Sequence, residues 1–337
     1  DLPSRGGGAA PRVAERADLE RVVEGWLDGH AYKALDAWYG NVRLVVYAMP
    51  STQTEEGIQH PLSVNLGGLV RLDGYSLATN EVAAGDILQL NLFWEAINVI
   101  PRRYKVFTHV VDEAGRLVGQ RDAEPCGGTR FTDTWREGER ISDRYGLPIL
   151  PGTAPGEYLI EVGMYNPEDG QRLPVVEGGQ AAGDHVILQK VHIVRPAAPP
   201  PLAALDMRQR RLVKGDNIQL LGFSFGKLGA GPEPLPALRP GDVAELVLFW
   251  QAVRTPPSDL QVVVRVVDGR GRVWLESVAP PVGGRYPLSL WQPQEIVRDP
   301  LHLALPGDLQ PGRYRLFVSW QGQTPASTAA LLHFMVQ

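Results

Sequence analysis

A tryptophan, a glutamate and an aspartate recur at the same even spacing, Trp-x-x-x-Glu-x-x-x-Asp, at two places 156 residues apart. In an extended chain, residues at even spacing point to one face, so the indole would lie beside two carboxylates. Such a face could stack a sugar ring and hydrogen-bond its hydroxyls. Gly138 and Pro293, inside the motifs, argue against a helix there. The candidate ligand-binding residues are Trp135, Glu139, Asp143, Trp291, Glu295 and Asp299.

The same residues also have an architectural interpretation. The tryptophans could fill the interior of the fold, while the acids cap turns or pair with Arg116 and Arg272, which recur at the same offset. A glycosidase would use two carboxylates, one of them in an apolar pocket that raises its pKa. Nothing in the sequence places either acid in such a pocket, so hydrolysis is the least favoured chemistry.

Other reactive side chains form no catalytic or metal-binding pattern. Cys126 has Val282 at its equivalent position, which indicates a small apolar filler and not a nucleophile. The 7 histidines form no closely spaced pair of the zinc type. No phosphate-binding loop, dinucleotide fingerprint or serine elbow occurs. We therefore predict no catalytic residue, no metal and no cofactor.

The motifs belong to a longer repeat. Residues 85–165 align with residues 241–321 without a gap, with 26 of the 81 positions identical. A constant offset through strands and turns indicates one folding unit copied whole. Each copy alternates short β-rich runs with turn residues and contains no long helical pattern. We predict an all-β fold of two tandem antiparallel β-sandwiches, immunoglobulin-like or jelly-roll-like, with Trp94 and Trp250 in their cores.

Two local patterns favour sandwiches. Residues 112–115 and 268–271 read Asp-x-x-Gly between valine-rich runs, which predicts a hairpin in each copy. A Pro-Gly-x-Tyr sequence precedes a further apolar run in each copy. Tyr158 and Tyr314 are therefore predicted to form tyrosine corners, in which the hydroxyl bonds back to the backbone.

The first 57 residues differ from the rest. Leu19, Val22, Val23 and Trp26 recur on one face of an amphipathic helix predicted from about residue 14 to residue 28. Two predicted strands come next. We expect a small N-terminal α/β appendage that packs on the adjoining β-rich region or ends an upstream domain. The predicted boundaries are 1–57 for the appendage, 58–196 for the first sandwich, 197–202 for a proline-rich linker and 203–337 for the second sandwich.

Charge and hydropathy exclude several partners. The formal net charge is −5 and no Lys/Arg cluster stands out, so nucleic acid and anionic membrane surfaces are not expected partners. No apolar run reaches the length of a membrane span. The chain has no initiator Met and no signal-peptide pattern, which we interpret as a processed chain or a fragment.

Several phrases occur together and in order: residues 106–118 (VFTHVVDEAGRLV), 135–143, 155–158 (PGEY) and 162–174. They resemble the extracytoplasmic C-terminal regions of bacterial, notably chloroflexal, family 39 glycosyltransferases. Residues 40–47 resemble the segment that joins that family's membrane part to its β modules. The resemblance implies a polytopic parent enzyme that moves a sugar from a polyprenyl-phosphate carrier to an acceptor. That family's catalytic acids lie in loops of its membrane domain, so no catalytic residue is carried over to this chain.

We therefore predict a non-catalytic, extracytoplasmic accessory region that presents or binds a glycan or protein acceptor. Two alternatives stay open. A free-standing carbohydrate-binding module would expose Trp135 and Trp291 as platforms, and a structural subunit of a cell-surface layer or filament would self-associate through edge strands. Residues 163–165 (Gly-Met-Tyr) become Ser-Trp-Gln in the second copy, so a ligand site built on that phrase exists at most once.

Overall fold

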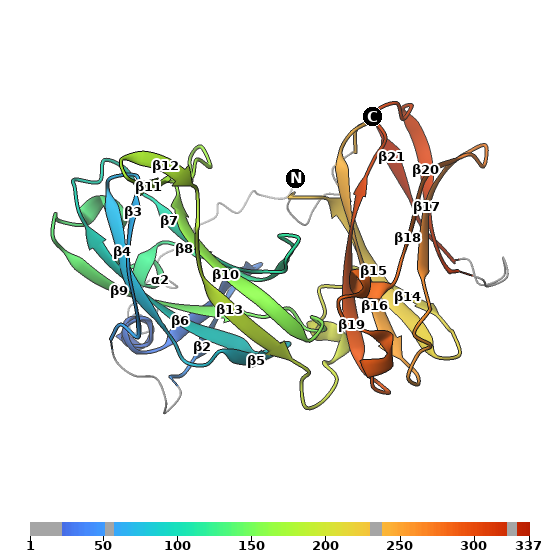
Figure 1. The fold of residues 1–337 in the computed structure, drawn as a ribbon, viewed down its shortest axis with the longest axis horizontal. Helices are drawn as coiled ribbons and strands as arrows, with labels where there is room; N and C mark the ends of the chain where they lie inside the picture. The colour runs from blue at the N-terminus through green and yellow to red at the C-terminus, as the bar shows by residue number, and fades with distance from the viewer. Residues whose placement is uncertain (1–21, 51–56, 230–237, 322–328) are drawn as a thin grey trace, which may run out of the picture. The chain divides into compact units, whose positions relative to one another are not determined.

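The computed structural model describes residues 22–50, 57–229, 238–321 and 329–337. Its secondary structure is mostly β, as predicted (Figure 1). The chain divides into two compact units. Unit one comprises Asp1–Asn80, Ile87–Pro148 and Leu159–Val191, and unit two comprises Glu81–Asp86, Ile149–Tyr158 and His192–Gln337. Residues 81–86 and 149–158 therefore belong to unit two, although the sequence places them before the linker.

An eight-stranded sheet forms one layer of the first sandwich, in the order β12-β11-β3-β4-β6-β9-β1-β2. Its paired strands are antiparallel except for β9 and β1, which are parallel. The strands are β1 (Tyr32–Tyr39), β2 (Val42–Ala48), β3 (His60–Leu66), β4 (Val70–Leu77), β6 (Ile87–Ala96), β9 (Arg140–Pro148), β11 (Val175–Glu177) and β12 (Gln180–Gly183).

A five-stranded sheet, in the order β5-β13-β10-β7-β8, forms the other layer, although β5, the start of β10 and the end of β13 belong to unit two. Its strands are β5 (Glu81–Ala83), β7 (Lys105–Val111), β8 (Leu117–Ala123), β10 (Gly156–Tyr165) and β13 (Val186–Val194). Between β8 and β9 the chain makes two short helical turns, α2 (Pro125–Gly128) and η1 (Thr132–Thr134).

Unit two contains two four-stranded sheets, β14-β15-β16-β19 and β18-β17-β20-β21. Every neighbouring pair in them is antiparallel. The strands are β14 (Gln209–Val213), β15 (Ile218–Lys227), β16 (Val243–Ala252), β17 (Val262–Asp268), β18 (Val273–Ala279), β19 (Ile296–Ala304), β20 (Gly312–Trp320) and β21 (Ala329–Val336). Three 3₁₀ turns accompany them: η2 (Leu202–Ala204), η3 (Pro281–Gly284) and η4 (Leu288–Leu290).

The cores follow from alternation along the central strands. In β6, every second residue from Leu88 to Ala96, with Trp94 among them, is fully buried, as the two-residue period of a strand requires. In β16 the same alternation directs Leu246, Leu248 and Trp250 into the main core of unit two. The predicted core positions of Trp94 and Trp250 are confirmed.

Hairpins and tyrosine corners form where the turn residues predict them. Strands β7 and β8 pair antiparallel, as do β17 and β18. The Tyr158 hydroxyl donates to Ala154 O at 2.7 Å, and the Tyr314 hydroxyl donates to Gln310 O at 2.8 Å. Both copies thus form the same succession of elements from β6 to β10 and from β16 to β20, while the duplication itself stays a prediction.

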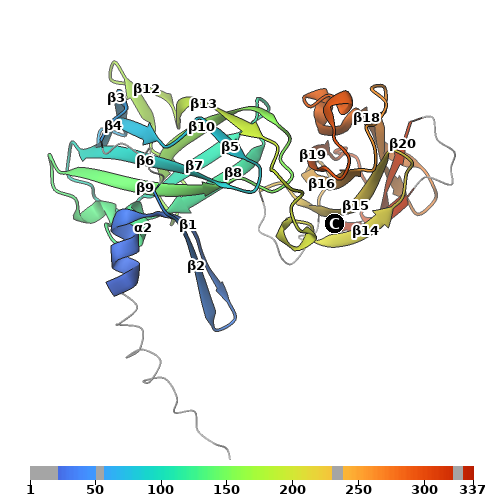
Figure 2. The same ribbon diagram turned by 90° about the horizontal axis from the view of Figure 1, so that it is seen from below.

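The N-terminal appendage packs on the first sandwich. A helix over residues 22–30 precedes β1, and Lys33 of β1 pairs with Tyr145 of β9, so the β1–β2 hairpin continues the large sheet. Lys33 Nζ lies 2.7 Å from Asp28 Oδ1 and donates to Gly127 O at 3.1 Å. Figure 2 shows the helix and the hairpin projecting from the same side of this sandwich. Leu19 lies outside the described residues.

Candidate functional site

The two motif tryptophans are buried. Trp135 is 5% exposed and Trp291 is 1% exposed. Each indole closes its own loop, because Trp135 Nε1 donates to Arg130 O at 3.4 Å and Trp291 Nε1 donates to Tyr286 O at 3.3 Å. Each ring also follows a 3₁₀ turn and not an extended run. The predicted stacking platform is therefore wrong in both copies, and so is the exposure that the carbohydrate-binding-module alternative requires.

The first motif aspartate is fully buried and accepts three hydrogen bonds. Asp143 Oδ1 accepts the backbone N–H of Cys126 at 2.7 Å. Oδ2 accepts the indole N–H of Trp94 at 3.3 Å and the hydroxyl of Tyr145 at 2.7 Å. Asp143 thus ties strand β9 to the core tryptophan of β6 and to the turn at α2.

The second copy repeats this arrangement. Asp299 Oδ1 accepts the backbone N–H of Val282 at 2.7 Å, and Oδ2 accepts the indole N–H of Trp250 at 3.0 Å. Cys126 and Val282 both have left-handed backbone conformations, with φ of 52° and 55°. This conformation costs a non-glycine residue roughly 1–2 kcal/mol. The carboxylate bond to each strained N–H stabilises the turn, so both aspartates have an architectural role.

Burial governs the ionisation of this cluster in the first copy. Loss of solvation raises the pKa of Asp143 to about 6, against the opposing effect of the three donors. Burial also raises the pKa of Cys126 to about 12, with Asp143 adding to the shift. The thiol is therefore protonated at neutral pH and is a poor nucleophile.

The two motif glutamates hold the turns that follow the tryptophans. Glu139 Oε2 accepts the backbone N–H of Arg136, and Glu295 Oε2 accepts that of Gln292, each at 2.8 Å. Glu139 is half-buried and pairs with Arg130 of its own copy. The glutamates therefore share one backbone contact and differ in the partner of their charge.

In the second copy the charge partner comes from the segment just before the predicted linker. Tyr286 replaces the arginine, and its hydroxyl donates to Glu295 Oε1 at 3.0 Å. Arg195, two residues before the predicted linker, places Nε 3.1 Å from Glu295 Oε1 and donates through Nη2 to Leu290 O at 2.9 Å. The Nε contact is an ion pair without hydrogen-bond geometry. A depression of about 170 Å³ lies between residues 195–200 and the Glu295 turn.

In the first copy the equivalent position is a larger, open depression of about 530 Å³. Its lining is polar and consists of Arg130, Thr134, Arg136, Glu137, Gly138 and Glu139. Of the candidate site residues, only Glu139 reaches this surface. The structure thus buries five of the six residues, Glu295 among them, and leaves only Glu139 partly exposed at a surface turn.

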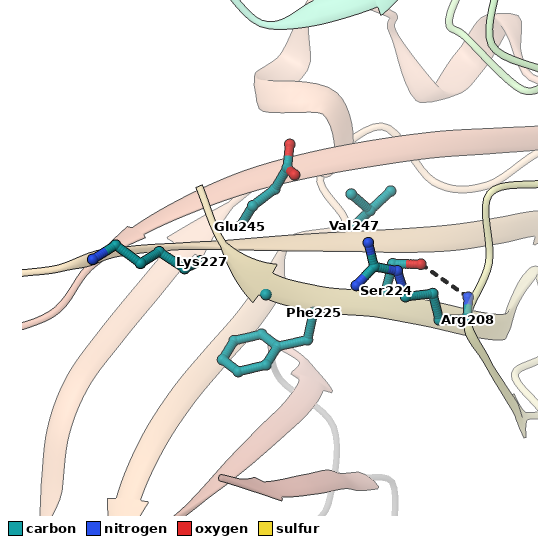
Figure 3. Close-up of a pocket in the computed structure, with 7 residues that line it drawn as sticks. Arg208, Ser224, Phe225, Lys227, Glu245 and Val247 are labelled. Atoms are coloured by element: carbon teal, nitrogen blue, oxygen red, sulfur yellow. Dashed lines mark hydrogen bonds between the residues drawn. The ribbon is translucent and has the colours of Figure 1, made fainter. Parts of the chain in front are cut away.

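A smaller recess lies in unit two beside β15 and β16 (Figure 3). The backbone N–H of Arg208 donates to Ser224 Oγ at 2.9 Å, and Lys227 pairs with Asp242 at 2.8 Å. The recess has a volume of about 40 Å³, which suits water and not a sugar.

The described part of the chain holds no group of three or more metal-ligating side chains. Within the same residues, no helix combines the length and hydropathy that a membrane span requires. No protein-family model matches the chain, and no curated protein matches it significantly.

Two contributors to these sites could not be identified from the sequence. Arg130 pairs with Glu139, but the aligned residue in the second copy is a tyrosine, Tyr286. Comparison of the two copies therefore did not identify an arginine as the partner of the motif glutamate. Arg195 lies 100 residues before Glu295 in the chain, at the end of the predicted first sandwich and two residues before the predicted linker. The sequence signal that was available for this contact is Arg195 itself, an arginine directly before a proline-rich run and outside the aligned repeat.

Proposed function

We propose that the chain is a non-catalytic, extracytoplasmic accessory region of a glycosyltransferase-like membrane protein, which binds and presents a glycan acceptor. The phrases shared with family 39 glycosyltransferases support the cellular setting. The commitment of Asp143 and Asp299 to their own turns supports the non-catalytic role, because neither carboxylate is free to transfer a proton to a ligand.

The observation that carries the binding role is the open depression at Glu139. Its volume, about 530 Å³, lies within the usual range for small-ligand sites. Guanidinium groups of Arg130 and Arg136 and carboxylates of Glu137 and Glu139 line it. These groups donate and accept hydrogen bonds in fixed planes, as the many hydroxyls of a glycan require. The linker-covered counterpart in the second copy supports a single acceptor site.

A glycan-binding experiment tests this proposal. The full chain is titrated against an array of immobilised bacterial surface glycans, and the hits are measured by calorimetry. Arg136→Ala removes an exposed guanidinium from the depression and should weaken binding at least tenfold. Gln292→Ala, its counterpart in the second copy, is the matched control and should bind like the wild type. Absence of any glycan hit, or equal loss in both variants, would contradict the acceptor role.

An activity assay tests the non-catalytic part. The chain is incubated with polyprenyl-phosphate sugars and glycan acceptors, and transfer and hydrolysis products are measured by mass spectrometry. We expect no turnover above the uncatalysed rate. Turnover that disappears in Glu139→Gln would show that the depression is an active site.

A further inference from the structure

The N-terminal helix, residues 22–30, packs with its charged face inward. The side chains of Glu24 and Asp28 turn toward Lys33, which is only 2% exposed, at 3.2 and 2.7 Å. The apolar residues Val22, Val23 and Trp26 are instead 53% to 73% exposed. An amphipathic helix on a soluble fold normally buries its apolar stripe. The expected direction of packing is therefore reversed, and the apolar face is left outside.

The β1–β2 hairpin ends in a second exposed apolar group. Trp38, Tyr39 and Val42 are 62% to 68% exposed, around a two-residue turn of Gly40 and Asn41. Tyr39 pairs with Val42 across the ladder, so their side chains share one face of the hairpin. Trp38 lies on the other face. The tip thus presents apolar side chains on both of its faces. The hairpin itself projects from the sandwich (Figure 2).

The charges nearest the tip are paired with one another. Arg43 donates to Asp36 Oδ1 at 2.8 Å and to Glu24 Oε2 at 2.9 Å. These bonds raise the pKa of Arg43 and lower the pKa values of Asp36 and Glu24. The network joins the helix to the hairpin and fixes both apolar groups on one body. Residues 37–42 carry no formal charge, so the tip complements an uncharged or zwitterionic partner and not an ionic one.

The shape and chemistry favour a bilayer interface over a protein surface. A stable protein interface buries about 800 Å² on each partner, mostly with a continuous and complementary surface, whereas this patch is a projecting tip and the end of one helix. Tryptophan and tyrosine are enriched where membranes meet water, because their rings are apolar and their N–H or O–H groups stay hydrated. The hairpin tip is a two-stranded ribbon with hydrogen-bonding groups on its outer edges, which suits the headgroup region and not the hydrocarbon core.

We propose that the N-terminal helix and the tip of the β1–β2 hairpin dock this chain on the zwitterionic surface of a lipid bilayer, with Trp38, Tyr39 and Val42 among the headgroups. This inference goes beyond glycan binding, and its surface shares no residue with the depression at Glu139. The two proposals can therefore fail separately.

The test is flotation of the full chain with phosphatidylcholine vesicles. We expect the wild type to float with the vesicles equally at low and high salt, because no charge drives the contact. Each buried aromatic ring contributes roughly a tenfold change in partitioning, so Trp38→Ser combined with Tyr39→Ser should weaken vesicle binding by more than tenfold. Val99→Ser removes an equally exposed apolar side chain elsewhere, at 70% exposure, and should bind like the wild type.

A second readout keeps the test independent of folding defects. Lipids with a spin label near the headgroup should quench the wild-type fluorescence of Trp38 and Trp26. Trp38→Phe should lose the share of this quenching that Trp38 contributes, while its thermal unfolding is unchanged. The proposal is overturned by wild-type chain that does not float, by binding that requires anionic lipid, or by a double variant that binds like the wild type. Sedimentation showing a dimer that the double variant abolishes would assign the patch to a second copy and also overturn it.

Discussion

Asp143 accepts three hydrogen bonds through two buried oxygens. Asp143→Asn replaces one oxygen with an NH₂ group, so one donor faces another donor in either amide orientation. We expect this change to lower the free energy of unfolding of unit one by about 1–3 kcal/mol. Asp299→Asn should act similarly on unit two. The measurement is urea unfolding at pH 7, and a stability unchanged in both variants would show that the carboxylates do not hold their turns.

The ionisation of Asp143 predicts that the stability of the folded chain falls as the pH rises. Its pKa of about 6 in the folded chain exceeds the ordinary value of 3.8 because the carboxyl is buried. The folded state therefore holds its proton more tightly than the unfolded state, and this contribution to stability is lost as the pH rises from about 4 to about 6. It amounts to about 3 kcal/mol. The difference in stability between wild type and Asp143→Asn should change across this window, and a constant difference would contradict the assignment.

The sequence predicted the importance of the motif residues but not their placement. Even spacing directs side chains to one face only while the chain is extended. The turns η1 and η4, immediately before Trp135 and Trp291, rotate both indoles inward. The aspartates bond the backbone of the preceding turns, α2 and η3, and the core tryptophans. Such contacts between residues distant in the chain leave no periodic pattern in the sequence.

Among the secondary-structure elements, the hairpins and the tyrosine corners could be predicted from the residues of their turns alone. The Asp-x-x-Gly turns and the Pro-Gly-x-Tyr phrases determine short-range hydrogen bonds, so these predictions are confirmed. The N-terminal helix differs, because periodicity identifies an apolar face without saying where it points. Its direction depends on Lys33, a buried cation that requires the carboxylates of the helix on its side.

The arginine–glutamate pairs at the two glutamate turns should contribute differently to stability. Arg195→Ala leaves the largely buried Glu295 without its cation, and we expect unit two to lose roughly 1–3 kcal/mol of stability. Tyr286→Arg in that background places a cation where the first copy has Arg130, and it should restore part of the loss. Thermal unfolding measures both effects.

Arg130→Ala is the matched control, because its ion pair with Glu139 is more exposed to solvent. Such pairs contribute about 0–1 kcal/mol. Equal losses in Arg195→Ala and Arg130→Ala would contradict the view that burial makes the linker contact the stronger one.

At the scale of the whole molecule, the repeat and the compact units do not share their boundaries. Residues 149–158 lie in the first copy of the repeat but belong to unit two. Ala154 joins the main core cluster of that unit, and Gly152 O accepts the backbone N–H of Arg298 at 2.7 Å. Composition and turn signals mark the proline-rich linker clearly, but they do not reveal that an earlier segment completes the second core.

The outer strands of the sheets would allow the self-association that the surface-layer alternative requires. The outer strands of the four sheets include β2, β8, β18 and β21, and edge strands offer hydrogen-bonding groups to another chain. Sedimentation over a range of protein concentrations distinguishes a monomeric accessory region from a self-associating subunit.

The assignment of residues 149–158 predicts which unit responds to a single substitution. Gly152 has a φ of +84°, and an added Cβ would lie 3.3 Å from Arg298 N. Gly152→Ala should therefore have two effects: a backbone strain of about 1 kcal/mol and a close contact between the new Cβ and β19. Both should lower the unfolding temperature of unit two. Gly68 has a similar φ of +71° and open space around it. Gly68→Ala should therefore add the backbone strain without a close contact, and the strain should affect unit one. Calorimetry of the full chain resolves the two cases: if Gly152→Ala shifts the transition of unit one instead, residues 149–158 stabilise the sandwich in which the sequence places them.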